Sequence, residues 1–323
     1  MNPDTQTKSI SINLGVSACL LGECVRYDGG HKHNRYITDT LSKVFHLVAV
    51  CPEVESGMST PREAMRLEGD PSAPRLVTHQ TKIDKTEQML EYCGRKVKSL
   101  EKEGLSGFIF KEKSPSSGLY QVKVYGVSGV PIQNGRGLFA AAVARHFPWL
   151  PLEEADRLND PAIRENFIER IFSYHRWQDF LMTEPRLGDL INFHTRHKLL
   201  IMAHSPELYK EMGGVVAGRK LLTHMQLLDR YQELFMKALT EIASIGRNIN
   251  VLQHIMGYFK NELTSWEKTE LLAAMERYHA HQVPLLVPLT LLKHYVGKYD
   301  QQYLQEQIYL TPHPTELMLQ NHA

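Results

Sequence analysis

The chain has 323 residues and carries 37 Lys and Arg against 36 Asp and Glu, a formal net charge of +1. Apolar residues make up 42% and aromatic residues 9%, which is too rich for a wholly disordered chain. With 21 Gly and 4 Cys, collagen-like and disulfide-scaffold proteins are excluded too. The near-neutral charge gives no global reason to expect a nucleic-acid partner, which would need a local basic surface. The length favours about two domains.

The sequence has no pattern typical of a membrane span or a signal peptide. The longest apolar stretch, residues 283–292, contains two prolines and falls well short of the ~20 residues that a span needs. The opening residues, MNPDTQTKSIS, are polar and lack the apolar segment of a signal peptide. We therefore expect a cytoplasmic protein with no membrane partner and no obligate protein partner. In that compartment its cysteines are free thiols, metal ligands or catalytic groups rather than disulfides.

The first half of the chain alternates between strand and helix patterns. Short apolar runs rich in β-branched residues predict strands at residues 10–19, 44–51, 107–110 and 121–125. Between the second and third runs, apolar residues three and four apart predict an amphipathic helix that buries Leu90, Cys93, Val97 and Leu100. Strands separated by helices predict an α/β domain with a parallel or mixed sheet.

The second half reads as helical throughout. Asp160-Pro161 is typical of a helix start, and the pattern predicts a helix from there to about residue 180. Further helices are expected at residues 189–204, 206–213, 220–245, 248–261, 264–280 and 288–307. We therefore divide the chain into a polar tail (1–12), an α/β domain (13–175) and an all-α C-terminal domain (183–323), with residues 183–186 as the clearest linker.

Three polar motifs follow three of the predicted strands. They begin at Cys19 (CLLG), at Cys51 (CPEV) and at Lys113 (KSPSSG). In open α/β sheets, ligand sites form beyond the carboxyl ends of the strands. If these strands run parallel, the motifs meet in one cleft and bring two thiols together with the carboxylate of Glu53 and several serine hydroxyls.

Each of these groups also has an ordinary structural interpretation. Cys19 and Cys51 could be small buried core residues, as free cysteines often are. Cys93 lies on the apolar stripe of its helix and is expected in the core, and Cys24 is expected to be a spare thiol in a polar loop. The spacings typical of zinc sites, C-x-x-C and H-E-x-x-H, are absent.

The order of the motifs resembles a known family. CLLG…RYDGG, CPEV…TPRE and K-x-SPS-x-G, over about residues 13–160, resemble the thiouracil-desulfidase (TudS-like) domain family. The following segment resembles a second, helical family through residues 193–198, 202–206, 250–258 and 284–289. The fusion of the two resembles the RudS group of tRNA 4-thiouridine desulfidases. It implies that the first domain removes sulfur from 4-thiouridine and that the helical domain binds the tRNA.

The resemblance also implies a cofactor and residue roles. A 4Fe–4S cluster held by three cysteines keeps one iron open for the thiocarbonyl sulfur, and water attacks the carbon, so that oxygen replaces sulfur without net redox chemistry. On the matching positions, Cys19 and Cys51 are two of the ligands. Glu53 is the general base or proton shuttle, and Ser114 is a polar contact to substrate or water.

The third ligand position departs from the family pattern. The usual motif is Ser-Pro-Ser-Cys-Gly, and this chain has Ser117 in the place of the cysteine. The cluster could persist with Ser117 or water there, Cys24 could substitute, or the chain could hold no stable cluster, naturally or through an engineered change. Three functions therefore stay open: a desulfidase, an RNA-binding protein without cluster chemistry, and a zinc or redox-thiol protein.

The helical half has a mild local excess of positive charge. Residues 186–237 contain eight Lys and Arg against five Asp and Glu, which is also compatible with an ordinary solvated helix face. Following the resemblance, we expect Arg196, His197 and Lys198 to contact RNA. Such contacts to phosphates would make binding sensitive to salt.

Overall fold

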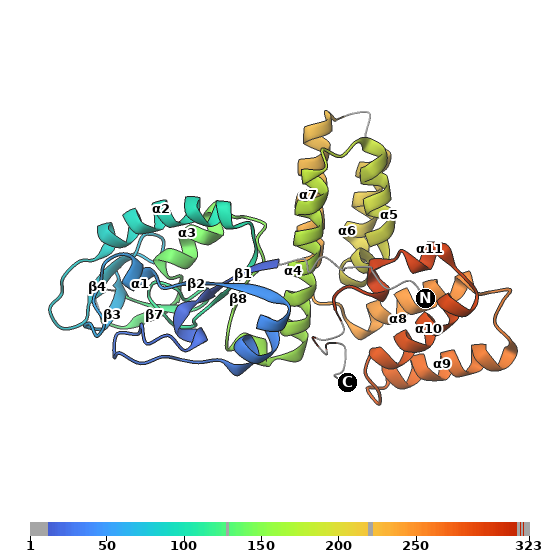
Figure 1. Cartoon of the computed structure of the whole chain (residues 1–323), viewed down its shortest axis with the longest axis horizontal. Helices are drawn as coiled ribbons and strands as arrows, with labels where there is room; N and C mark the ends of the chain where they lie inside the picture. The colour runs from blue at the N-terminus through green and yellow to red at the C-terminus, as the bar shows by residue number, and fades with distance from the viewer. Residues whose placement is uncertain (1–11, 127–128, 219–221, 315–316, 318, 320–323) are drawn as a thin grey trace, which may run out of the picture. The chain divides into compact units, whose positions relative to one another are not determined.

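The computed structural model describes residues 12–126, 129–218, 222–314, 317 and 319 (Figure 1). The chain divides into two compact units, one ending at Asn159 and the other starting at Asp160. Most of the tail expected at residues 1–12 lies outside the described residues. The predicted order of an α/β domain followed by an all-α domain is confirmed.

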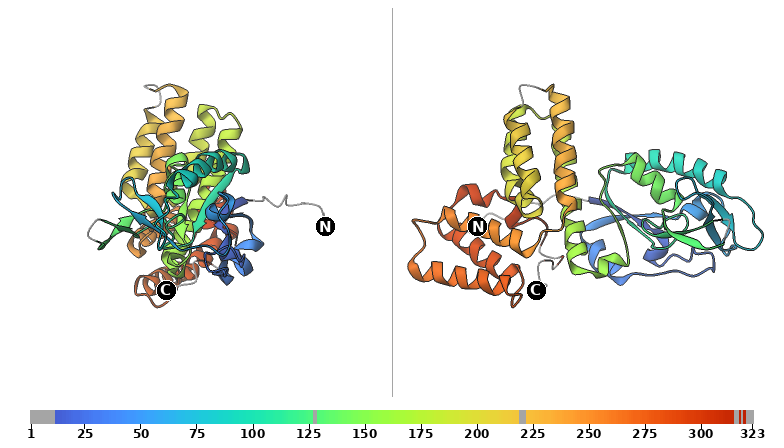
Figure 2. Two further views of the ribbon diagram at one scale, coloured as in Figure 1. Left: turned by 90° about the vertical axis from the view of Figure 1, so that its left-hand side faces the viewer. Right: turned by 180° about the vertical axis from the view of Figure 1, so that it is seen from behind.

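The first unit is built on a four-stranded parallel sheet with strand order β2-β1-β5-β8. Strand β1 (Ile12–Ser17) lies in the centre and pairs in parallel with both β2 (Phe45–Val50) and β5 (Leu105–Phe110). Strand β8 (Leu152–Glu154) pairs in parallel with β5. Helices α2 (Thr86–Glu103) and α3 (Leu138–His146) pack together over one face of this sheet (Figures 1 and 2).

The first unit also contains a second four-stranded sheet, in which parallel and antiparallel pairs are mixed. Its order is β4 (Arg75–Thr78), β3 (Met65–Glu68), β6 (Val122–Tyr125) and β7 (Pro131–Gly135). The strand predicted at residues 121–125 is therefore present, but it belongs to this sheet and not to the parallel one. We did not predict β3, β4, β7 or β8, because strands of three to five residues are too short to show a clear apolar period.

The face of helix α2 differs slightly from the prediction. Cys93, Val97 and Leu100 are buried as expected, whereas Leu90 is 51% exposed. Met89 and Tyr92 are buried in its place. Adjacent residues on a helix point about 100° apart. An apolar face assigned to residue 90 instead of residue 89 therefore still gives an amphipathic pattern in the sequence.

The second unit consists of helices that pack on one another. Its first helix, α4 (Pro161–Met182), begins as predicted, with the Asp160 side chain accepting hydrogen bonds from the backbone N–H groups of Ala162 and Ile163. The others are α5 (Leu187–His204), α6 (Pro206–Ala217), α7 (His224–Thr240), α8 (Ile245–Tyr258), α9 (Ser265–His279), α10 (Leu286–Lys298) and α11 (Gln302–Gln305). Helix α4 is continuous and packs on α7, so residues 160–175 belong to this unit and not to the first domain, where we had placed them.

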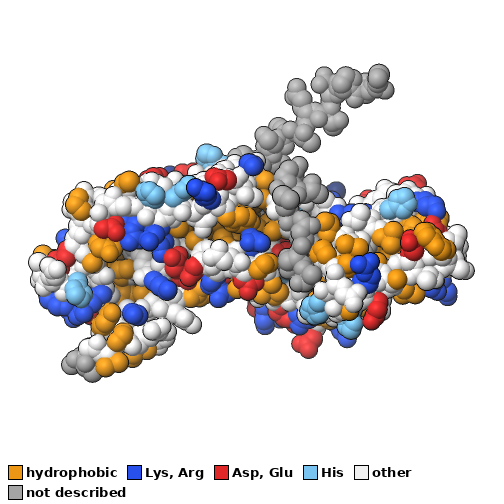
Figure 3. Space-filling model, turned by 90° about the horizontal axis from the view of Figure 1, so that it is seen from below, with side chains coloured by type: hydrophobic (Ala, Val, Ile, Leu, Met, Phe, Trp, Pro, Cys, Tyr) orange, Lys and Arg blue, Asp and Glu red, His pale blue; other side chains and the backbone are white. Residues whose placement is uncertain are grey.

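The surface carries both signs of charge. Figure 3 shows Lys and Arg side chains interspersed with Asp and Glu on the visible face, in line with the net charge of +1. None of the helices among the described residues combines the length and the apolar composition that crossing a membrane requires.

The boundary between the two units, at residues 159 and 160, predicts which fragments of the chain fold. Phe167, Ile168 and Ile171 on the first half of α4 are fully buried. A fragment of residues 160–323 should therefore unfold cooperatively on heating, whereas a fragment of residues 176–323 should lose its cooperative transition, since each lost core side chain costs about 2–5 kcal/mol. Circular dichroism melts of the two fragments measure this. Equal melting temperatures would show that the start of α4 does not belong to the core of the second unit.

Candidate active site

One cavity of about 510 Å³ lies where β1, β2 and β5 end, and all three predicted motifs line it. Because β1 pairs in parallel with both neighbours, the segments that follow these strands emerge at the same edge of the sheet. The convergence of the motifs expected from the sequence is thus seen in the structure. The lining includes Cys19, Cys51, Glu53, Arg62, Ser114 and Ser117.

Local backbone structure places the two thiols. After β1 the chain forms a 3-10 turn, Ala18–Leu21, which ends at Gly22 with a left-handed φ of 94° that favours glycine. The carbonyl of Cys19 accepts a hydrogen bond from the backbone N–H of Lys32 at 2.8 Å, which ties down the following loop. After β2, Cys51 precedes the short helix α1 (Pro52–Glu55), whose first turn carries Glu53 into the cavity.

The serine motif forms a tight turn held by Ser114. Its hydroxyl accepts hydrogen bonds from the backbone N–H groups of Ser116 (3.3 Å) and Ser117 (3.1 Å). The start of α3 supports the turn from behind, since the N–H of Phe139 donates to the carbonyl of Ser116 at 2.8 Å. A Cβ at Gly137 would lie 2.4 Å from the Ser116 carbonyl carbon, so only glycine permits this approach. Ser114, expected as a substrate contact, thus lines the cavity but also holds the turn.

The carboxylate of Glu53 links the second and third motifs, and Arg62 connects it to the loop of the first. Ser116 Oγ donates a hydrogen bond to Glu53 Oε1, and Glu53 Oε2 lies 3.5 Å from Cys51 Sγ. Arg62 forms an ion pair with the same oxygen, Nη2 to Oε2 at 3.8 Å, and donates to the carbonyl of Val25 at 3.0 Å. We had quoted Ser116 and Arg62 within motifs but given them no role, since no spacing rule shows which polar residue reaches the carboxylate.

Burial controls the protonation of the two thiols. It raises the pKa of Cys19 to about 11, partly opposed by the nearby Lys111. It raises the pKa of Cys51 to about 12, and the negative charge of Glu53 adds to the effect. Both thiols are therefore protonated at neutral pH, and a metal that binds them must displace their protons.

The remaining candidate ligands are placed differently. Ser117 is buried, 4% exposed, and lines the same cavity as the two thiols. Cys24 is exposed and is not among the residues that line the cavity. Cys93 is buried on α2, as expected for a core residue.

The cavity is more basic than the molecule as a whole. Two acidic residues line it, Glu53 and Glu112, against five basic ones, namely Arg26, Lys32, Arg62, Lys111 and Lys113. Lys111 is paired with Glu112, and Arg26 is paired with Asp28 at 3.3 Å. The excess of positive charge suits a ligand that carries phosphate or another anion.

In the helical unit, the three residues expected to contact RNA differ in how far they are exposed to solvent. Arg196 is exposed, and Lys198 is half-buried with its ammonium 4.6 Å from the centre of the Tyr303 ring. His197 is only 2% exposed and stacks on Phe193 at 3.9 Å between ring centres. His197 is buried because it lies one turn after Phe193 on the core face of α5. A side chain in this position cannot make the direct RNA contact that we expected.

Two family models match the chain. The model of 2-thiouracil desulfurase matches residues 14–155, and the model of a protein family of unknown function, DUF1722, matches residues 198–314. The two matches fall in the first and second compact units.

Two curated proteins and one solved structure are also similar to parts of this chain. The uncharacterized protein YbgA of Escherichia coli K12 is 31% identical over 156 residues, which are 47% of this chain and 90% of YbgA. The uncharacterized protein YbbK of Bacillus subtilis 168 is 32% identical over 109 residues, 32% of this chain and 71% of YbbK. A solved structure, the [4Fe-4S]-dependent thiouracil desulfidase TudS, shows 28% identity and a TM-score of 0.39 over 48% of this chain and 97% of its own.

The raised thiol pKa values predict slow alkylation in metal-free protein. Iodoacetamide reacts with the thiolate, whose fraction falls about tenfold for each unit by which the pH lies below the pKa. Labelling of Cys19 and Cys51 should therefore be slow at pH 7 and increase steeply to pH 9, as measured by peptide mass spectrometry. Exposed Cys24 serves as the accessible control within the same chain. Labelling of Cys51 at pH 7 as fast as that of Cys24 would contradict a buried, protonated thiol.

Proposed function

The chain belongs to the 2-thiouracil desulfurase family through its first unit and carries a DUF1722 domain in its second, and on this premise we propose that it removes sulfur from 4-thiouridine in tRNA. In this reaction water supplies the oxygen of the new carbonyl, and the sulfur leaves as sulfide with the two protons of the water. The observation that supports it best is the cavity in which Cys19, Cys51 and Glu53 meet.

The donor chemistry of the cavity fits the 4Fe–4S cluster that the proposal requires. Thiolates are the ligands that such clusters select, and Cys19 and Cys51 would hold it from the ends of two neighbouring strands. Ser117 would face it from the third motif with a harder oxygen donor. When bound, the cluster would supply a Lewis-acidic iron with affinity for the soft thiocarbonyl sulfur.

Glu53 is the residue placed to move protons. Its carboxylate lies 3.5 Å from Cys51 Sγ and is held by Arg62 and Ser116, so its position is fixed before substrate binds. It would accept the proton of the attacking water at Oε2 and later give it to the departing sulfur. The Arg62 guanidinium would keep this carboxylate oriented during both transfers.

The basic side chains that line the cavity support the proposal of a nucleic-acid substrate. Lys32 and Lys113 are exposed at its wall, where they would bind the phosphates that flank a thiolated base. The base itself would have to leave its stack to reach the thiols. On the helical unit, exposed Arg196 and the Lys198 ammonium beside Tyr303 would add contacts to the tRNA.

One observation favours a second candidate function. Because Ser117 stands where the resemblance implies a third cysteine, the chain could bind RNA without cluster chemistry. Anaerobic purification with iron and sulfide analysis separates the two functions, and bound zinc would instead favour the zinc or redox-thiol alternative.

Replacing Ser117 with cysteine gives a sharp prediction. The Ser117→Cys variant should bind more iron after anaerobic reconstitution and remove 4-thiouridine from tRNA faster, because it adds a third thiol to the cavity without changing the backbone hydrogen bonds of the turn. The measurements are iron and sulfide content and nucleoside analysis of the treated tRNA, with the free nucleoside as a second substrate.

The matched control is Cys93→Ser, which changes a thiol in the core of the same unit and should leave iron content unchanged. Iron uptake that does not rise in Ser117→Cys, together with an inactive parent, would contradict the desulfidase proposal. Activity on the free nucleoside but not on tRNA would contradict the tRNA specificity alone.

The Glu53→Gln variant tests the proton transfer. Glutamine keeps the shape of the side chain but cannot accept a proton, so turnover should fall by about two to four orders of magnitude at unchanged iron content. Single-turnover assays and iron analysis of the same preparation measure both quantities. A parallel loss of iron and activity would show that Glu53 serves the structure of the cavity and not the chemistry.

A further inference from the structure

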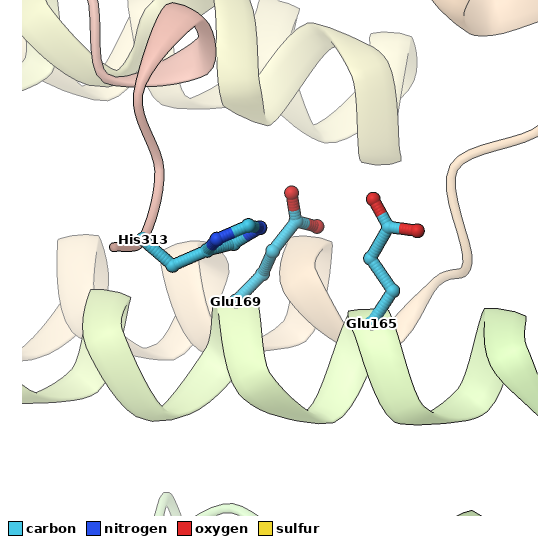
Figure 4. Close-up of side chains that lie close together, drawn as sticks. All are labelled: Glu165, Glu169 and His313. Carbon is cyan, nitrogen blue, oxygen red and sulfur yellow. The ribbon is translucent and has the colours of Figure 1, made fainter. Parts of the chain in front are cut away.

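A second cluster of ligating side chains lies in the helical unit, in residues that the proposed function does not use. Glu165 and Glu169 stand one turn apart on α4, and His313 follows the 3-10 turn Ile308–Leu310 (Figure 4). One ligand atom from each of the three residues lies within 4.8 Å of the other two. Residues far apart in the sequence therefore bring two carboxylates and an imidazole together.

The imidazole of His313 is buried with an unmet nitrogen. The residue is 8% exposed, and its Nδ1 lies 3.2 Å from the carbonyl of Pro314. Its Nε2 is buried and has no hydrogen-bond partner in the described part of the chain. The ring is turned toward the carboxylate of Glu169 (Figure 4). A buried polar atom without a partner is costly, and a bound ligand would remove that cost.

We propose that Glu165, Glu169 and His313 bind a divalent first-row transition metal ion of the Mn²⁺ or Zn²⁺ class. Carboxylate oxygen and imidazole nitrogen are donors that these ions accept, at bond lengths of about 2.0–2.2 Å. Two such bonds span at most about 4.4 Å, which is close to the 4.8 Å limit within which the three donor atoms already lie.

A further histidine orients one of the ligands. His204 Nε2 lies 3.1 Å from Glu169 Oε2, and His204 Nδ1 lies 2.6 Å from the carbonyl of Glu241. This contact fixes one carboxylate oxygen of Glu169 and leaves the other for the ion. Outer contacts of this kind are what set the direction of ligands in metal sites.

The site has room for water or a small ligand on one side. Glu165 and Glu169 line a cavity of about 300 Å³ within the helical unit, together with Ser244, Tyr278 and other residues. Two of the three donors thus reach the cavity wall, so an ion bound to them would have coordination positions open toward the cavity, as catalytic metal sites do.

Arg176 is the arginine whose charge acts on both Glu169 and His313. Burial lowers the pKa of His313; the carboxylate of Glu169 opposes this, and the charges of Arg176 and Lys293 add to it. Arg176 donates hydrogen bonds to the carbonyl of Pro312 (2.9 Å) and to Ser173 Oγ (3.2 Å). Neither of these two bonds involves the carboxylate of Glu169.

Titration of the full-length protein with Mn²⁺, followed by electron paramagnetic resonance of the free ion, tests the proposal. We expect about one ion bound per chain and at least tenfold weaker binding in Glu165→Gln, Glu169→Gln and His313→Gln. Glu276→Gln removes the same charge from an exposed position on α9 and should bind as the parent does. A Cys19→Ala/Cys51→Ala double variant should also retain the site, because its donors lie in the other unit.

Folding is checked on each variant by circular dichroism, and Co²⁺ provides a second readout. Cobalt at oxygen and nitrogen donors gives weak visible bands without the charge-transfer absorption of a thiolate, so the spectrum identifies the donor set directly. Folded parent protein that binds no Mn²⁺ or Co²⁺ would overturn the proposal. So would binding that disappears in the double cysteine variant or weakens equally in Glu276→Gln. None of these outcomes depends on whether the first unit is a desulfidase.

Discussion

The parallel pairing of β1 with both β2 and β5 is the constraint on which the candidate active site depends. It sends three loops to one edge of a sheet, although their functional residues are separated by tens of residues in the sequence. Each loop then needs only local structure to position its side chain: a 3-10 turn for Cys19, a proline-started helix for Glu53, and a serine-held turn for Ser117. A change in the register of β1 against its two neighbours would move Cys19 away from Glu53 and Ser117.

The interior of the cavity combines groups that oppose one another. Removing thiols from water favours their neutral form, and the adjacent Glu53 carboxylate strengthens that preference. The Arg62 guanidinium compensates the charge of the carboxylate, and basic side chains outnumber acidic ones among the residues that line the cavity. The same site can therefore favour protonated thiols and still attract an anionic ligand.

The sequence predicted those features that depend on long or directional patterns. Long apolar strands and the helix start at Asp160 were visible, and the direction of the strands brought Cys19 and Cys51 together as expected. The exposure of Leu90 was not predictable, because a shift of one residue leaves an amphipathic pattern intact. His197 was expected at an RNA-binding surface from the resemblance, although its position four residues after Phe193 places it on the core face of its helix. The contact between Ser116 and Glu53 joins residues 63 positions apart, a distance at which local rules carry no information.

In the turn at residues 114–118, the shape of the backbone does not depend on which donor atom the side chain of residue 117 carries. The backbone is fixed by the Ser114 hydroxyl, by the start of α3 and by the close approach of Gly137, none of which involves the side chain of residue 117. Many serine codons become cysteine codons through one nucleotide change. Selection can therefore exchange the donor at this position without first solving a folding problem, and lineages that gain or lose the third thiol are expected to share an otherwise unchanged cavity.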